Sequence, residues 1–223
     1  MGPTTDTDTL VESWSTNADR WRDVIAQGAI ASRRLATDAA IVEAVRSLAP
    51  QTILDVGCGE GWLARALRPH VASAVGFDVS PELIEHARAA GGDIDYRVAS
   101  YAEVIESPAV LGGGFEAIAV NFALLDPAAG ELLAALRRIA APGGALVVQT
   151  LHPCELGGNY VDGWRTEQFT TFGAERWAPM PWYFRTFGSW LRLIVEHWRV
   201  EWVAEPLNPD TQRPASLLVV ARV

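Results

Sequence analysis

The sequence lacks lysine altogether, because all 18 of its basic residues are arginine. This absence excludes the enzyme classes that need an amine side chain, among them Schiff-base enzymes, P-loop nucleotide hydrolases and protein kinases. Cysteine is almost as scarce, with Cys58 and Cys154 as its two examples. Two cysteines are too few for a disulfide framework or a four-ligand zinc site, so we expect reduced thiols and no metal centre.

Positive charge and long apolar runs are lacking as well. The 18 basic residues face 27 acidic ones, which gives a net charge of −9 at pH 7. A phosphate backbone would meet net repulsion, so we expect no nucleic-acid partner. The longest apolar stretches, 117–125 and 145–151, fall far short of the ~20 residues of a membrane span, and the polar segment 1–10 does not match a secretion signal. We therefore expect a cytoplasmic protein without membrane association.

Hydrophobic residues are abundant, at 49% of 223 positions, which is enough for one sizeable core. Apolar residues at helical spacing predict two helices before Pro50, with a break near Gln27 and Gly28. From Gln51 onward, short β-branched runs alternate with helical segments. The predicted strands are 52–56, 74–77, 94–98, 115–121, 145–150, 199–204 and 216–221. The predicted helices between them are 62–67, 81–90, 130–140 and a short one from a Ser189 cap to about 196.

This alternation predicts an α/β fold, a doubly wound sheet of seven mostly parallel strands with helices on both faces. The last two strands look like an antiparallel pair. We interpret residues 1–223 as a single domain in four parts: N-terminal helices (1–49), a strand–helix core (50–150), an insertion (151–188) and a C-terminal helix with the strand pair (189–223).

The insertion reads as a long loop that is unusually rich in aromatic residues. Its rings are Trp164, Phe169, Phe172, Trp177, Trp182, Tyr183, Phe184 and Phe187. Such a segment can enclose an apolar or aromatic molecule, but the rings can equally form the loop's own core or a dimer contact. Arg165 and Arg185 could bind a carboxylate there, although solvent exposure or pairing with Glu167 and Glu175 is the simpler expectation.

The most informative segment is a glycine loop that follows the strand 52–56. Gly57, Gly59 and Gly61 stand at alternate positions, Asp55 precedes them, and a helix follows. Glycines there let the backbone turn tightly and approach a ligand. Asp78 ends the next strand, about 20 residues later, where an acid can accept both hydrogen bonds of a ribose diol. The pattern indicates a nucleotide-like crevice at the carboxyl edge of the sheet.

The spacing G-x-G-x-G between these acids resembles the class I S-adenosylmethionine-dependent methyltransferases of the small-molecule type. The resemblance covers residues 51–150. It implies S-adenosylmethionine as cofactor, with the three glycines beside its amino-acid part, Asp78 on the ribose and Asp55 organising the loop. It also implies adenine contacts from Val79, Ser100 and Tyr101, and a site edge formed by Asn121 and Phe122. Ser100 with Glu103 would serve equally well as a helix cap.

The resemblance extends to the segments that would cover the site. N-terminal helices close over the cofactor in related enzymes, which makes Trp14, Trp21 and Arg33 candidates, with Arg33 for the cofactor carboxylate. Core packing would explain the two tryptophans without a ligand. In the aromatic insertion, from here on called the lid, we expect Tyr160, Trp182 and Tyr183 to contact the acceptor.

His152 immediately follows the fifth predicted strand, at the same edge as the crevice. Its imidazole could take a proton from a neutral O–H acceptor, or it could merely order the start of the lid. We therefore expect methyl transfer to oxygen or nitrogen of a small apolar or aromatic molecule, by a monomer or homodimer, achieved mainly through alignment. The alternatives are an NAD(P)-dependent reductase, which the glycine spacing and the missing lysine disfavour, and a non-catalytic binding protein on the same fold.

Overall fold

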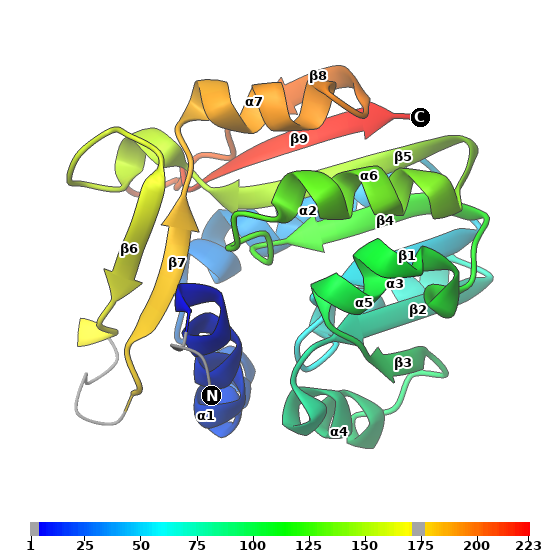
Figure 1. The fold of residues 1–223 in the computed structure, drawn as a ribbon, viewed down its shortest axis with the longest axis horizontal. Coiled ribbons are helices and arrows are strands. Elements are labelled where there is room, and N and C mark those ends of the chain that lie inside the picture. The colour runs from blue at the N-terminus through cyan, green and yellow to red at the C-terminus, as the bar shows by residue number, and fades with distance from the viewer. Residues whose placement is uncertain (1–4, 171–176) are drawn as a thin grey trace.

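The structure is a computed structural model, which describes residues 5–170 and 177–223. Its main sheet has seven strands in the order β3-β2-β1-β4-β5-β9-β8. The first five pair in parallel, and β9 runs antiparallel to both β5 and β8 (Figure 1). The strands are β1 Thr52–Val56, β2 Ser73–Asp78, β3 Asp95–Val98, β4 Phe115–Asn121, β5 Ala140–Leu151, β8 Arg199–Ala204 and β9 Ser216–Arg222. The predicted fold class is confirmed.

Helices cover both faces of this sheet because its central strands are apolar on both sides. The residues of β1 after Thr52 are all buried, and so is nearly all of β4 and β9. One face carries α2 Asp38–Ser47, α3 Trp62–Leu67 and α4 Pro81–Ala89. The other carries α5 Tyr101–Glu106, α6 Ala129–Ile139 and α7 Phe187–Val195. Short helical turns lie at Arg33–Thr37, Arg68–His70, Pro108–Leu111 and Pro153–Glu155.

The lid is not the irregular loop that its composition predicts. Its strands β6 Gly163–Glu167 and β7 Met180–Phe184 form an antiparallel pair separate from the main sheet. The two strands satisfy each other's backbone hydrogen-bonding groups in a segment that carries many aromatic side chains. Residue preferences for loops do not reveal this pairing. Phe172 and Glu175 lie outside the described residues.

The first helix, α1 Asp6–Ala26, joins the lid to the core. It packs along β7 on one side and against α4 on the other (Figure 1). The Asn17 amide donates to the Ala178 carbonyl and accepts from the Ala178 N–H, both at 3.0 Å. On the α4 side, His86 Nε2 lies 3.0 Å from Asp19 Oδ1. The helix therefore spans the space in front of the carboxyl ends of the strands.

Three local predictions need correction. The α7 helix is capped by Thr186, whose hydroxyl accepts from the Ser189 N–H, because Thr186 is the last residue in extended conformation. Strand β5 begins at Ala140 instead of the predicted 145, because the segment between them pairs with β4 through an irregularity in register. The sequence predicts only a possible cap at Ser100, and the structure has the helix α5 after it.

Over the described residues, no helix combines the length and apolarity needed to span a membrane.

Candidate active site

The glycine loop lies between β1 and α3, where all three glycines adopt left-handed backbone conformations. A side chain at Gly57 would place its Cβ 2.6 Å from the Cβ of Ala123, beyond the end of β4. The corresponding position at Gly59 meets nothing within 4 Å. Gly57 is therefore required for close packing within the protein, whereas Gly59 presents bare backbone to open space that a ligand can use.

Asp78 lies at the end of β2 and faces this loop. Its Oδ2 accepts from the Gly59 N–H and its Oδ1 accepts from the Ser80 N–H, both at 2.9 Å. Burial raises the pKa of Asp78, while these backbone hydrogen bonds oppose the rise. Each oxygen of an ionised carboxylate has about two acceptor positions, so one on each remains for a further donor. That arrangement fits the two hydroxyls of a ribose.

Asp55 has a different task, although it is equally buried. Its Oδ2 accepts from the Ala64 N–H at 3.1 Å, which fixes the first turn of α3 against β1. Burial raises the pKa of Asp55 to about 7, and the negative charges of Asp78 and Glu60 add to the rise. The contact agrees with the expected role of organising the loop.

Tyr101 and Ser100, the predicted adenine contacts, follow β3. Ser100 is a helix cap, because its hydroxyl accepts from the Glu103 N–H in a complete capping box. Tyr101 donates to the Ala123 carbonyl at 3.0 Å, and its ring packs edge-on against Phe77 at 6.2 Å. Burial raises the pKa of Tyr101 well above its usual value, so the hydroxyl stays neutral. Tyr101 thus bridges the ends of β3 and β4, and its adenine contact, like that of half-buried Val79, stays a prediction.

The end of β4 is held by a buried amide network. Gln149 Nε2 on β5 donates to Asn121 Oδ1 at 2.7 Å and to the Thr37 carbonyl at 2.9 Å. The Ser216 hydroxyl of β9 donates to the other amide atom, Gln149 Oε1. Phe122 follows with φ of +54°, a conformation that bulky residues rarely adopt. Such strain is typical of functional sites, where the surrounding structure imposes it.

His152 lies just beyond β5 and is almost fully buried. Its Nε2 is 2.6 Å from Oε1 of Glu205, which follows β8. When Nε2 donates to this carboxylate, the neutral form of the imidazole has its lone pair on Nδ1. Among the described residues, Nδ1 has no hydrogen-bond partner. This is the tautomer that a general base needs, and no sequence signal pointed to Glu205 as its partner.

The lid residues take several roles. The Tyr160 hydroxyl accepts from the Phe187 N–H at 2.9 Å, and half of this side chain is exposed. Tyr183 donates its backbone N–H to the Leu125 carbonyl, which joins β7 to the loop after β4. Trp182 is half-buried beside Phe184, with ring centroids 6.1 Å apart. Their contacts with an acceptor stay predictions.

Arg185 departs from its expected exposure. Only 4% of the residue is exposed, and its Nη2 donates to the Asp126 carbonyl. Burial is possible because two aromatic rings, those of Tyr183 and Trp190, lie 4.8 and 5.2 Å from the guanidinium carbon. No salt bridge to it is found among the described residues. The expectation that Arg185 is solvent-exposed or ion-paired is therefore wrong for the part of the chain that the structure describes.

The two N-terminal tryptophans pack with the lid. Trp14 and Trp21 lie with ring centroids 5.6 Å apart, and Trp21 is 5.0 Å from Trp177. These rings belong to a small core shared by α1 and the lid. Arg33 lies elsewhere, with its Nε 2.9 Å from Asp38 Oδ1 and its guanidinium 4.6 Å above the Trp62 ring. It therefore stands next to the residue that follows Gly61, a position compatible with binding a cofactor carboxylate.

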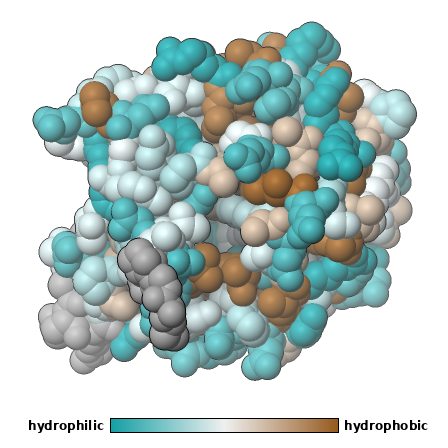
Figure 2. Space-filling view, viewed as in Figure 1, coloured by the Kyte–Doolittle hydropathy of each residue, from teal (hydrophilic) through white to brown (hydrophobic). Residues whose placement is uncertain are grey.

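Several buried polar side-chain atoms have no hydrogen-bond partner. Within the described residues the set is Trp21 Nε1, Thr37 Oγ1, Glu60 Oε1, His152 Nδ1 and Arg185 Nη1. Buried polar groups are normally paired, so each of these atoms needs an explanation. Figure 2 shows this face of the molecule hollowed between α1 on one side and α4 and α5 on the other. The open face of Gly59 and the Asp78 carboxylate beside it fit a polar, nucleoside-bearing ligand.

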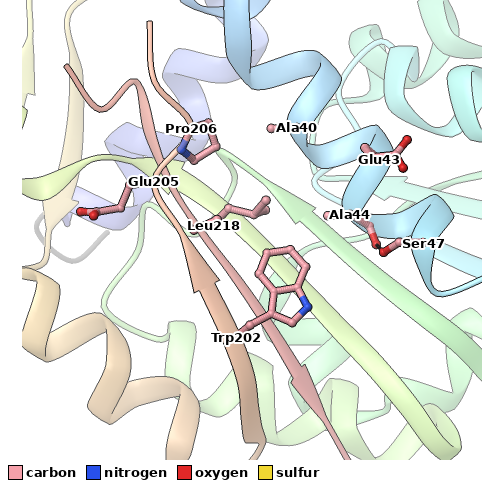
Figure 3. Close-up of a pocket in the computed structure, with 9 residues that line it drawn as sticks. Ala40, Glu43, Ala44, Ser47, Trp202, Glu205, Pro206 and Leu218 are labelled. Carbon is pink, nitrogen blue, oxygen red and sulfur yellow. Dashed lines mark hydrogen bonds between the residues drawn. The ribbon is translucent and has the colours of Figure 1, made fainter. Parts of the chain in front are cut away.

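A separate groove of about 390 Å³ lies on the opposite side of α2 from the loop, between α2 and the strands β8 and β9. Figure 3 shows Ala40, Ala44, Trp202 and Leu218 along it. The Glu205 side chain points away from these residues, consistent with its contact to His152 (Figure 3). The groove is thus outside the site formed by the loop and the lid.

The order and directions of the strands are those of the fold that solved S-adenosylmethionine-dependent methyltransferases share. Residues 53–144 match the family described as "Methyltransferase domain". The chain is 32% identical over 149 residues to a ubiquinone biosynthesis O-methyltransferase of Methylococcus capsulatus, covering 64% of this chain and 61% of that protein. A protein of the same name from Xylella fastidiosa is 38% identical over 114 residues, covering 48% and 44%. The chain thus spans less than two thirds of the length of these curated relatives.

Solved structures show the same fold at lower identity. An S-adenosylmethionine-dependent methyltransferase from Mesorhizobium loti superposes with a TM-score of 0.65 at 24% identity, covering 81% of this chain and 96% of that one. A Burkholderia thailandensis 1,6-didemethyltoxoflavin-N1-methyltransferase gives a TM-score of 0.67 at 18% identity, covering 100% and 90%. The resemblance predicted from the loop and Asp78 is confirmed.

Proposed function

We propose that this chain transfers a methyl group from S-adenosylmethionine to an oxygen or nitrogen of a small apolar or aromatic molecule, with a hydroxyl oxygen as the favoured acceptor atom. The observation that carries the choice of oxygen is the His152–Glu205 contact, which leaves a buried imidazole lone pair at the edge of the site. An aromatic hydroxyl must lose its proton during methylation, and a neutral imidazole is suited to accept it. The O-methyltransferase relatives agree with this choice.

When bound, the cofactor supplies a methyl group on a positively charged sulfur, which becomes a neutral thioether as the methyl group leaves. The protein residues bind and align the reactants. The glycine loop and Asp78 would hold the amino-acid and ribose parts, and Arg33 beside Trp62 would face the carboxylate. His152 Nδ1 would take the hydroxyl proton while Glu205 holds the ring in the required tautomer. Alignment by α1 and the lid, which also exclude water, would supply much of the rate.

The two rival functions make different predictions. A dinucleotide enzyme would have the all-parallel order 3-2-1-4-5-6, whereas here the antiparallel β9 is inserted between β5 and β8. A non-catalytic binding protein would use the His152–Glu205 contact only for structure, so it would show no turnover on any acceptor. We still expect a small-molecule acceptor and no nucleic-acid partner. We also expect the protein to be a monomer or a homodimer.

The test begins with calorimetric titration of the purified protein with S-adenosylmethionine and S-adenosylhomocysteine. Methyl uptake from labelled cofactor is then measured on matched catechols, phenols and anilines. We expect cofactor binding and faster methylation of hydroxyl than of amine acceptors. Asp78→Asn should weaken cofactor binding at least tenfold, whereas Asp210→Asn, an exposed turn residue, should leave it unchanged. No heat with either compound would refute the proposal, and binding without turnover on any acceptor would favour the non-catalytic alternative.

A further inference from the structure

Arg185 is a buried cation whose hydrogen-bonding capacity is only partly used. Its side chain follows β7 and is 4% exposed. Nη2 donates to the carbonyls of Asp126 and Pro127, at 2.6 and 3.1 Å. Nη1 has no hydrogen-bond partner within residues 5–170 and 177–223. A guanidinium remains charged in a protein, so burial leaves the two N–H groups of Nη1 without a hydrogen-bond acceptor.

The neighbouring carboxylates do not complete this site. Asp126 accepts from the Thr7 hydroxyl through Oδ2 and from the Ala128 N–H through Oδ1, both at 2.7 Å. Asp162 accepts from the Thr186 N–H at 2.8 Å. Both acids attract the guanidinium at longer range, yet burial dominates and lowers the pKa of Arg185. The nearby negative charges are thus committed to other donors.

The position of Arg185 relates it to the acceptor side of the site. The two carbonyls that hold it belong to the loop after β4, which begins with Phe122. Two residues further along the chain, Phe187 packs against His152, with ring centroids 6.4 Å apart. The segment that carries Arg185 therefore contacts the loop after β4 on one side and the proposed base on the other.

We propose that Arg185 Nη1 binds a carboxylate of the methyl acceptor, so that the substrate class is aromatic or apolar acids. This inference rests on the proposed function, since it assigns the acceptor of that same site. Nη2 is committed to two carbonyls, so the N–H groups of Nη1 would donate to the carboxylate, and the aromatic rings of Tyr183 and Trp190 around the guanidinium exclude water, which strengthens the charge-assisted bond. The net charge of −9 makes a local cationic group the feature that would attract an anionic substrate.

The test compares benzoate with benzamide, which have similar shape but differ in charge. Both are titrated by calorimetry into the full-length protein, with and without saturating S-adenosylhomocysteine. The variants are Arg185→Met, which keeps a long apolar stem, and Arg185→Lys, which keeps a cation but has one nitrogen for both the carbonyls and the ligand. Arg199→Gln is the matched control, since it removes a positive charge from an arginine whose side chain is 70% exposed.

We expect benzoate to bind at least tenfold more tightly than benzamide to the unmodified protein and to Arg199→Gln. The preference should disappear in Arg185→Met and fall at least threefold in Arg185→Lys. Equal binding of the two compounds to the unmodified protein would overturn the proposal, as would a preference that survives in Arg185→Met. If Arg185→Met does not fold, an undiminished preference in Arg185→Lys would overturn it instead.

Failure of this inference is distinguishable from failure of the proposed function. Absence of cofactor binding, with the benzoate preference intact, would refute methyl transfer and leave the Arg185 site standing. Methyl transfer to neutral phenols at the same efficiency as to hydroxybenzoates would leave the function standing and refute the acid-binding role.

Discussion

Nε2 of His152 lies 2.6 Å from Oε1 of Glu205, although 53 residues separate the two in the chain. The histidine side chain is only 3% exposed, whereas the glutamate is half exposed. The contact therefore connects a buried ring to a carboxylate at the boundary with solvent. It fixes which imidazole nitrogen carries the proton, and several predictions concern its use.

Replacing His152 by alanine should slow methylation of a hydroxyl acceptor by about 10²- to 10⁴-fold, the range usual for loss of a general base. The dissociation constant of S-adenosylhomocysteine should change little, because the proposed cofactor contacts lie at the glycine loop and Asp78. Initial rates and calorimetry measure the two quantities. Unchanged turnover of an O–H acceptor would show that the histidine only orders the start of the lid.

Glu205→Gln tests positioning separately from proton transfer. Glutamine can accept from Nε2–H or donate to Nε2, so it permits the wrong tautomer. We expect a fall in kcat of about tenfold, with KM nearly constant and a changed pH profile of kcat. Glu43→Gln, in the neighbouring groove, is the control. A loss confined to thermal stability would indicate a purely structural contact.

Gly57→Ala should weaken cofactor binding and destabilise the fold by about 1–3 kcal/mol, since its Cβ would overlap that of Ala123 at a φ of +62°. Gly112→Ala separates the two causes, because Gly112 has φ of +90° but open space around its Cβ position. The double variant Gly57→Ala/Ala123→Gly should recover the part due to overlap. Chemical denaturation and calorimetry provide the measurements, and a single variant as stable as the native chain would contradict the close packing.

Asp55 should make stability depend on pH. Its pKa is about 7 in the folded chain against an ordinary value of 3.8, so the folded form retains a proton that the unfolded chain has released. The stabilising contribution is fully present below 3.8 and is lost as the pH rises through 7. In Asp55→Asn, where the amide oxygen can still accept from Ala64, the free energy of unfolding should fall less between pH 4 and 8. Parallel slopes in the two proteins would refute this.

Asn17→Ala should release the lid from α1, because it removes both hydrogen bonds to Ala178 and leaves that half-buried backbone unpaired. We expect a loss of stability of about 1–3 kcal/mol and faster proteolysis within the lid. Asn208→Ala is the control, because it removes an amide side chain from an exposed turn far along the chain. Equal proteolysis rates would show that the aromatic core of α1 and the lid suffices to hold them together.

The sequence was informative wherever the interactions are local. The loop glycines, Asp55 and Asp78 were found because a parallel strand followed by a tight turn restricts residue types over a short stretch. The Ser100 cap could be anticipated for the same reason, since its partner Glu103 is three residues away. The secondary structure of the lid was harder to predict. Its composition suggested a loop, whereas pairing between β6 and β7 depends on residues separated along the chain.

By itself, then, the sequence determined the strand–helix order, the edge of the sheet that carries the site, and the residues of the glycine loop, because hydrophobic periodicity and backbone conformational limits act between near neighbours. Only the tertiary structure decided that Glu205 orients His152, that Arg185 is buried with an unused nitrogen, and that α1 shares a core with the lid. These contacts join segments far apart in the chain, and whether a charge ends in water or in the interior depends on what packs around it after folding.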